Sequence, residues 1–211
     1  GDGALRGWFE LKDGQPHAAT VDVALRAVSM RLASNVEPLT VAEVEGRLLA
    51  QRNKDGLVLE ARHFSFLTGE NVRWPRADMR LALRQRSGDD AITGGAFSAE
   101  TLDIGLMAQI ATRVPLGDAL RRLLAEVAPQ GTVSGLDARW DGPLDAPQHY
   151  AAKATLSGIT LASRASDQPG GVGRPGLRNA TLQLDANDAG GQARIGIQAG
   201  AIELPGVFDD P

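Results

Sequence analysis

Four acidic or imidazole side chains recur at intervals of four residues, which is the spacing of one helical ridge. They are Asp137, Asp141, Asp145 and His149. On a helix such a ridge could bind a divalent metal. Gly142, Pro143 and Pro147 break any helix in this stretch. In the alternating strand that the sequence favours instead, the first two aspartates face water, so we expect no metal site.

Three glycines match the GxGxxG pattern of dinucleotide-binding loops. They are Gly171, Gly173 and Gly176. That site needs a helix directly after the glycines, because the helix amides hold the pyrophosphate. Here Pro175 precedes the last glycine and an alternating stretch follows it. The pattern therefore predicts a loop.

The stretch DANDAGG, residues 185–191, resembles a calcium-binding loop. Its fifth position is Ala189, and its twelfth is Gly196 instead of the bidentate glutamate that such loops require. We therefore interpret it as a hairpin turn.

No constellation of side chains suggests nucleophilic catalysis. His17, His63 and His149 are isolated in strand or turn contexts, and no GxSxG motif is present. The chain has no cysteine, which excludes thiolate chemistry and disulfides. We expect a protein that is not an enzyme and uses no cofactor.

Composition narrows the partners further. The 211 residues include 22 basic and 26 acidic ones, for a net charge of −4, and no segment is both basic and aromatic. This balance argues against nucleic acid as a partner. No apolar run approaches the roughly 18 residues that a membrane-spanning helix needs.

Alternation of apolar and polar residues dominates most of the chain and predicts strands. In residues 20–32 the apolar positions change parity after Leu25, which indicates a bulge or a corner. Asn53–Gly56 has hairpin chemistry, and a further turn is predicted at RSGDD, residues 86–90. Because each strand has one polar face, we predict a mainly β fold, a curved antiparallel sheet with an open groove.

The middle of the chain has a helical period. Leu102, Leu106 and Ile110 are four residues apart, and Pro115 should divide two helices. We predict that the chain divides into a β segment at 1–98, a helical insert at 99–129 and a second β segment at 130–211, with the two β segments forming one continuous sheet. The helices of the insert should cover about 100–128, and Ser98 or Thr101 should cap the first one. The insert is expected to cover the apolar face of the sheet. A plug in a groove and a membrane-docking helix are the alternatives.

Two long stretches carry a family resemblance. They are LAEVAPQGTVSGLDARWDGPLDAPQHYAAKATLSGITL and RPGLRNATLQLDANDAGGQARIGIQAGAIELPGVFDDP. The ordered pattern resembles the YhdP family, AsmA-like proteins related to TamB. The resemblance implies an internal, periplasmic piece of a longer chain that is anchored in the inner membrane by an N-terminal helix. It also implies an apolar β-groove for phospholipid transport between inner and outer membranes, with no catalytic residues.

A lipid chain that leaves a bilayer exposes about 0.8 kcal/mol per methylene to water, and an apolar strip on successive strands could shield it. The candidate lining residues are Val21, Val23, Leu25, Leu57, Leu59, Met79, Leu81, Leu83, Leu136, Trp140, Leu156, Leu182, Leu184, Ile195 and Ile197. The core of a closed β-sandwich would give the same residues. The rival function is therefore a structural or assembly module of the cell envelope that binds partner proteins through its sheet edges. Separately, we expect that an excised piece of this kind can self-associate through its open sheet edges.

Overall fold

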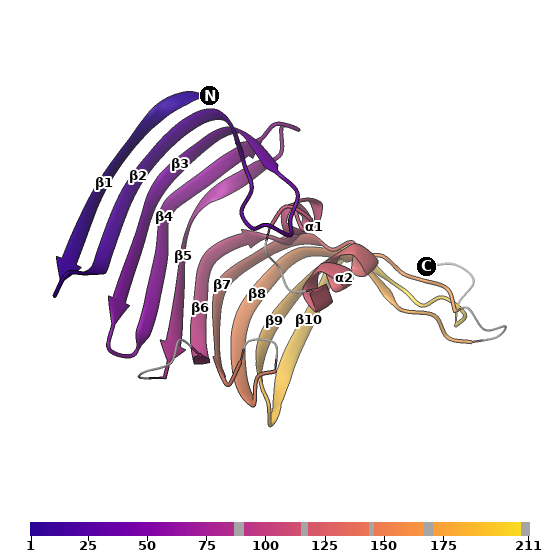
Figure 1. Cartoon of the computed structure of the whole chain (residues 1–211). Helices are drawn as coiled ribbons and strands as arrows, with labels where there is room; N and C mark the ends of the chain where they lie inside the picture. The colour runs from indigo at the N-terminus through magenta and orange to yellow at the C-terminus, as the bar shows by residue number, and fades with distance from the viewer. Residues whose placement is uncertain (87–90, 115–117, 144–145, 167–170, 208–211) are drawn as a thin grey trace.

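The computed structural model describes residues 1–86, 91–114, 118–143, 146–166 and 171–207. These residues form one ten-stranded antiparallel sheet in which each strand pairs with its neighbours in sequence (Figure 1). The strands are β1 (Asp2–Lys12), β2 (Gln15–Met30), β3 (Leu39–Asn53), β4 (Gly56–Thr68), β5 (Arg73–Gln85), β6 (Ile92–Asp103), β7 (Gln130–Asp141), β8 (His149–Leu161), β9 (Gly176–Asn187) and β10 (Gly190–Glu203). The sheet is open, with β1 and β10 as its edges, and curves into a trough. The prediction of a mainly β, curved antiparallel sheet is confirmed.

Two-residue turns join β1 to β2, β3 to β4 and β9 to β10 along one side of the trough. The Asn53 side chain accepts a hydrogen bond from the Asp55 amide at 3.0 Å, and the Asn187 side chain accepts one from the Ala189 amide at 2.9 Å. Such local bonds stabilise turns. The predicted hairpin at residues 53–56 is confirmed, and DANDAGG forms the β9–β10 turn. The turn predicted at 86–90 lies almost wholly outside the described residues.

Six strands contain a residue in the left-handed backbone region, with φ between 48° and 63°. These residues are Ala27, His63, Gly135, Gly158, Asn179 and Ala199. An extra or left-handed residue bends a strand and reverses the parity of the side chains beyond it. Ala27 lies where the sequence changes parity, as predicted. We call the part of the sheet between these bends and the tight turns the hairpin half, and the remainder the connection half.

Two helices connect β6 to β7. They are α1 (Ile104–Gln109) and α2 (Asp118–Val127), and Pro115, which was expected to divide them, lies outside the described residues. The prediction that the insert begins near residue 99 or 100 differs from the structure, because β6 pairs with β7 as far as Asp103. The predicted cap is also wrong: the Asp103 side chain, and not Ser98 or Thr101, accepts a hydrogen bond from the Leu106 amide at 2.9 Å. Neither helix, within the residues described, is long and apolar enough to span a membrane.

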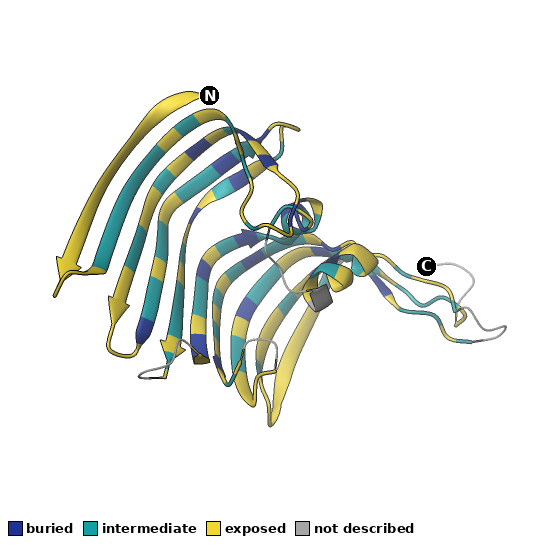
Figure 2. Cartoon of the chain, in the orientation of Figure 1, coloured by how far each residue is buried: buried dark blue, intermediate teal, exposed yellow. Residues whose placement is uncertain are grey.

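The hydrophobic core lies mainly in the connection half, beneath α1. Leu106 and Ile110 are buried there against the strand residues Val41 and Leu102. Phe66 stacks on a tryptophan and extends this core along β4 and β5. By contrast, the edge strands β1 and β10 are mostly exposed (Figure 2). The core therefore occupies the connection half and leaves the hairpin half of the sheet open.

Candidate functional site: an apolar groove

One row of directly paired residues crosses the hairpin half from edge to edge. From β1 to β10 the row consists of Phe9, Ala19, Ala50, Leu59, Leu81, Phe97, Ala138, Ala152, Ala186 and Gly191. Paired residues in an antiparallel sheet point to the same face. At about 4.8 Å between neighbouring strands, the row is about 43 Å long. It contains no polar side chain.

The register places all fifteen predicted lining residues on the face that carries this row. Trp140 is buried; Leu59, Leu184 and Ile195 are exposed, and the other eleven are half-buried. A closed sandwich would bury such residues beneath a second sheet, and the described residues supply no second sheet. Five of the fifteen also pack against the core under α1: Val23, Leu25, Met79, Leu136 and Leu156. The remaining ten line the open part of the groove.

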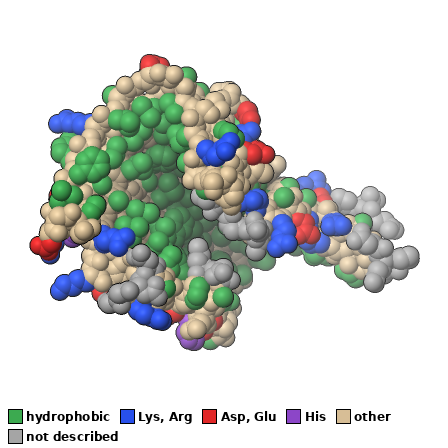
Figure 3. Space-filling model, viewed as in Figure 1, with side chains coloured by type: hydrophobic (Ala, Val, Ile, Leu, Met, Phe, Trp, Pro, Cys, Tyr) green, Lys and Arg blue, Asp and Glu red, His purple; other side chains and the backbone are tan. Residues whose placement is uncertain are grey.

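An apolar hollow in the groove lies over β2 to β6. Here Leu48, Leu59 and Phe97 surround a hollow of about 410 Å³. Figure 3 shows the hydrophobic side chains that line the hollowed face. Leu48 is 39% exposed and Leu59 is 37% exposed. Ligand-binding clefts typically measure roughly 300–1,000 Å³, so the hollow is large enough to hold part of an alkyl chain.

The segment after α1 contacts the β2–β3 and β4–β5 connections at the far side of the connection half. The Arg113 side chain donates a hydrogen bond to Glu70 at 2.7 Å, and the Glu37 amide donates one to the Thr112 carbonyl at 3.1 Å. These contacts hold α1 over the core from β6 back to the β2–β3 and β4–β5 connections. The expectation that the insert covers the apolar face therefore holds for α1 and the connection half.

The second helix covers less of the sheet. Leu124 of α2 is buried, whereas Leu120 and Leu123 are 42% and 54% exposed. Glu126, near the end of the helix, makes ion pairs with Arg164 and Arg174 of the β8–β9 connection. These contacts hold α2 beside β8 and β9, outside the open part of the groove (Figure 1).

The opposite face of the sheet is polar and rich in ion pairs. The Arg47 guanidinium donates to both oxygens of Asp22, at 2.5 and 2.9 Å, and lowers the pKa of that carboxyl. The Glu60 carboxylate accepts hydrogen bonds from Arg62 and Arg80, each at 2.6 Å. Along most strands polar or charged residues alternate with the groove residues, so one face is hydrated and the other apolar.

Among the described residues of the apparent metal ridge, Asp141 and His149 come together as directly paired residues of β7 and β8, whereas Asp137 lies apart, opposite Lys153. Asp137 and Asp141 lie on the outer face of β7, and Asp141 pairs with Arg84; Asp145 is outside the described residues. The Nδ1 atom of His149 lies 2.8 Å from Asp188, whose carboxylate raises the pKa of the imidazole through a hydrogen bond and its charge. No group of three or more potential metal ligands occurs in the described part of the chain.

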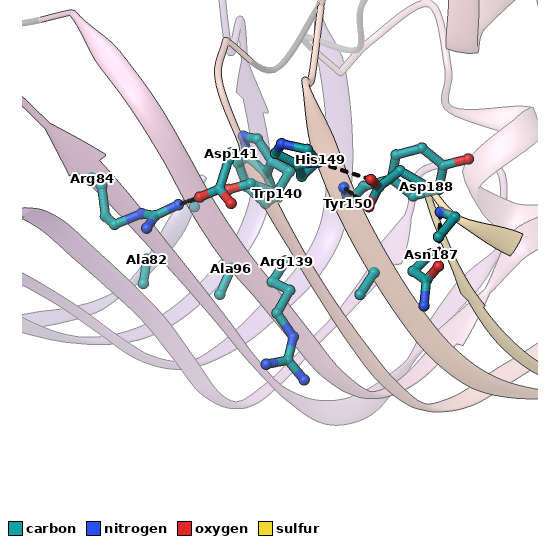
Figure 4. Close-up of a pocket in the computed structure, with 13 residues that line it drawn as sticks. Ala82, Arg84, Ala96, Arg139, Trp140, Asp141, His149, Tyr150, Asn187 and Asp188 are labelled. Carbon is teal, nitrogen blue, oxygen red and sulfur yellow. Dashed lines mark hydrogen bonds and ion pairs between the residues drawn. The ribbon is translucent and has the colours of Figure 1, made fainter. Parts of the chain in front are cut away.

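A shallow depression of about 670 Å³ lies beside these pairs, on the outer face near the hairpin turns (Figure 4). Ala82, Ala96 and Arg139 are paired across β5, β6 and β7 and project to one side of the sheet. The small alanines leave this space open. Sequence reasoning missed the depression and the His149–Asp188 pair, because both depend on strand register.

The other motifs also occupy structural positions. Gly171 and Gly173 belong to the β8–β9 connection, and Gly176 begins strand β9 instead of a helix. The His63 amide donates to the Asp78 carboxylate at 2.6 Å, at the bend of β4. The most pronounced feature of the described residues is therefore the apolar groove.

Comparison with known proteins identifies a family. A family model described as "YhdP protein" matches residues 1–211, the whole chain. No curated protein and no solved structure gives a significant match.

Proposed function

Because the chain belongs to the YhdP family, we propose that its groove carries the acyl chains of phospholipids between the inner and outer membranes. The chain would be a non-enzymatic, periplasmic segment of a longer protein anchored in the inner membrane. The headgroup would remain in water beyond the rim, and the acyl chain would lie along the strands' apolar face. This role requires shielding from water and no chemical step.

The continuous row across all ten strands carries the proposal. A chain of about fifteen methylenes costs on the order of 12 kcal/mol when exposed to water. The row, about 43 Å long, exceeds the roughly 30 Å hydrocarbon thickness of a bilayer. A lipid could therefore move from β1 to β10 while remaining on apolar surface throughout.

The shape of the lining also suits movement. Six of the ten row residues are alanine or glycine, and four of these follow one another from β7 to β10. These small side chains leave open space above the sheet between Phe97 and the β10 edge. A row without polar side chains offers no fixed hydrogen bond that would hold an acyl chain at one place. Such a surface favours sliding over tight binding at a single site.

Lipid binding to the purified chain tests the proposal. We expect organic extraction and mass spectrometry to recover phospholipid that copurifies with the protein, and a fluorescent palmitic acid analogue to bind with enhanced emission. Unlabelled palmitate should displace the analogue. A folded chain that carries no lipid and does not bind the analogue would contradict the proposal and favour the assembly-module alternative.

A further inference from the structure

The open groove has two different ends along its strands. On the connection side it ends against the core under α1, into which Met79 and Leu136 pack. On the hairpin side it ends at the turns, where exposed side chains meet water (Figure 2). An acyl chain that lies along the strands can therefore point its polar end toward the core or toward the turns. Burying a polar headgroup against the core would cost free energy, because the core residues there are apolar.

Polarity on the groove face increases toward the turns. On the core side of the row that crosses the hairpin half, the next paired positions from β2 to β7 are all apolar: Val21, Leu48, Ala61, Met79, Ala99 and Leu136. On the turn side lies a second row, from β3 to β8, which we call the rim row: Arg52, Leu57, Leu83, Gly95, Trp140 and Tyr150. Its polar groups are the guanidinium of Arg52, the indole N–H of Trp140 and the phenol of Tyr150, and both Arg52 and Tyr150 are exposed. The groove face thus changes from apolar to amphipathic in the order in which a phospholipid changes from tail to headgroup.

Trp140 brings a buried hydrogen-bond donor to the rim row. It is 9% exposed, and its Nε1–H has no acceptor among the residues that the structure describes. The indole lies against Gly95, since a β-carbon built at Gly95 would come within 2.5 Å of the ring atom Cζ2. A buried N–H without an acceptor destabilises a protein, so such a group often marks the place of a water or a ligand. Trp74 also has an unpaired indole N–H, but it stacks on Phe66 inside the core. Of the two, Trp140 is the one that lies in the open half of the groove, where a ligand can approach.

From these features we infer that a phospholipid lies in the groove with its headgroup at the rim row and its acyl tails directed toward the core under α1. Its ester and phosphate oxygens lie beside Trp140 and Tyr150, which are directly paired on β7 and β8 (Figure 4). The indole N–H and the phenol O–H donate hydrogen bonds to these oxygens. Tryptophan and tyrosine occupy the same level in membrane proteins, at the boundary between hydrocarbon and headgroups. The inference rests on the proposed function and adds the direction in which the lipid is held.

The depth of the open groove fits one leaflet of hydrocarbon. Leu83 of the rim row and Met79, which packs against the core, are four residues apart on β5. At about 3.4 Å per residue, the apolar floor between them is about 14 Å long. Half of the roughly 30 Å hydrocarbon thickness of a bilayer is about 15 Å. A lipid whose tails reach the core therefore has its ester groups at the level of the rim row.

Quenching of tryptophan fluorescence by brominated lipid tests this direction with the complete 211-residue chain. The chain has three tryptophans, so Trp8→Phe combined with Trp74→Phe leaves Trp140 as the sole tryptophan. This variant is loaded with phosphatidylcholine that is brominated near the ester end or near the methyl end of its acyl chains. Because bromine quenches an indole only on close approach, Trp140 should lose more emission to the ester-end bromines.

A second reporter, placed deeper in the groove, is the matched control. Phe97→Trp, in a chain whose three natural tryptophans are replaced by phenylalanine, moves the indole from the rim row toward the core. Its emission should fall more with the methyl-end bromines than that of Trp140 does, and circular dichroism checks that both variants fold. Stronger quenching of Trp140 by the methyl-end bromines, or equal quenching by both lipids, would overturn the inference and leave the proposed function intact. No quenching of either reporter by either lipid would contradict the proposed function, and this inference with it.

Removal of the indole N–H tests the contact itself. Trp140→Phe keeps an aromatic ring and loses one hydrogen bond, so the affinity for lysophosphatidylcholine, measured by isothermal titration calorimetry, should fall about 2- to 13-fold. Trp8→Phe makes the same substitution on the outer face, where Trp8 pairs with Thr20, and should leave the affinity within about twofold of the wild type. Equal affinities of Trp140→Phe and the wild type would overturn the assignment of the lipid's ester and phosphate oxygens to Trp140.

Discussion

Two consecutive leucines of β3 allow the groove to be tested within a single strand. Leu48 pairs with Val21 and Ala61 on the groove face, and Leu49 pairs with Thr20 and Glu60 on the outer face. Leu48→Asp therefore places a carboxylate in the apolar hollow, whereas Leu49→Asp places the same group on the hydrated face. The two variants have identical composition and net charge.

The expected loss of affinity follows from the surface that the carboxylate removes. Leu48 is 39% exposed, so Leu48→Asp forfeits part of a leucine's burial energy, about 1–2 kcal/mol of stability. An ionised aspartate keeps its water, and an alkyl chain that avoids it loses contact for two or three methylenes. At about 0.8 kcal/mol each, binding weakens by about 1.6–2.4 kcal/mol, or about 15- to 60-fold.

Fluorescence titration with the palmitic acid analogue measures this difference, and thermal unfolding followed by circular dichroism confirms that both variants are folded. Leu49→Asp should bind within about twofold of the wild type. Equal affinities for Leu48→Asp and the wild type would refute the assignment of the groove. Equal losses in both variants would show that the effect comes from stability and not from the lining.

Three further properties follow from the structure. The ion pair raises the pKa of His149 and lowers that of Asp188, so it stabilises the β9–β10 hairpin most at pH values between the ordinary pKa values of the two groups. This stabilisation fades as pH rises through the folded-state pKa of the imidazole, and NMR titration of Asp188→Asn should show a lower pKa for His149 than in the wild type. Gly158→Ala should lower the free energy of unfolding, measured in urea, by about 1 kcal/mol, because the φ angle of Gly158 is 63°. Gly196→Ala is the control, since Gly196 is equally free of neighbouring atoms and has no left-handed φ; equal effects of the two variants would contradict the role of the bend. Leu106→Ala should cost about 2–5 kcal/mol by the same assay, since α1 seals the core through this side chain; a loss below about 1 kcal/mol would argue against that role.

Alternation in the sequence is sufficient to predict most of the strands and the face to which each lining residue points. It cannot distinguish a residue under α1 from one in the open half, because both are apolar at the same parity. Leu156 and Leu184 illustrate this: the first packs against the core, and the second is exposed. Which half is sealed depends on where α1 folds back, and that is set by contacts such as Arg113 with Glu70.

The helical insert begins later than the sequence predicts, for a related reason. Leu102 and Leu106 are four residues apart and contact the same core, but one lies near the end of a strand and the other lies in a helix. A strand end and a helix that converge on one core can therefore imitate helical periodicity. Strand β1 is a different case. Gly3 and Gly7 interrupt the apolar alternation of Leu5 and Phe9, so alternation alone does not predict a strand there.

The bends link the curvature of the sheet to its apolar lining. Val23 and Leu25 face the groove, and in a regular strand Val28 and Met30, at the opposite parity, would face water. The left-handed residue Ala27 reverses the parity, so both pairs pack on the groove side. A left-handed alanine costs roughly 1–2 kcal/mol, which is less than the burial of two large apolar side chains contributes. The same change of parity that bends the strand thus directs its whole length of apolar side chains inward.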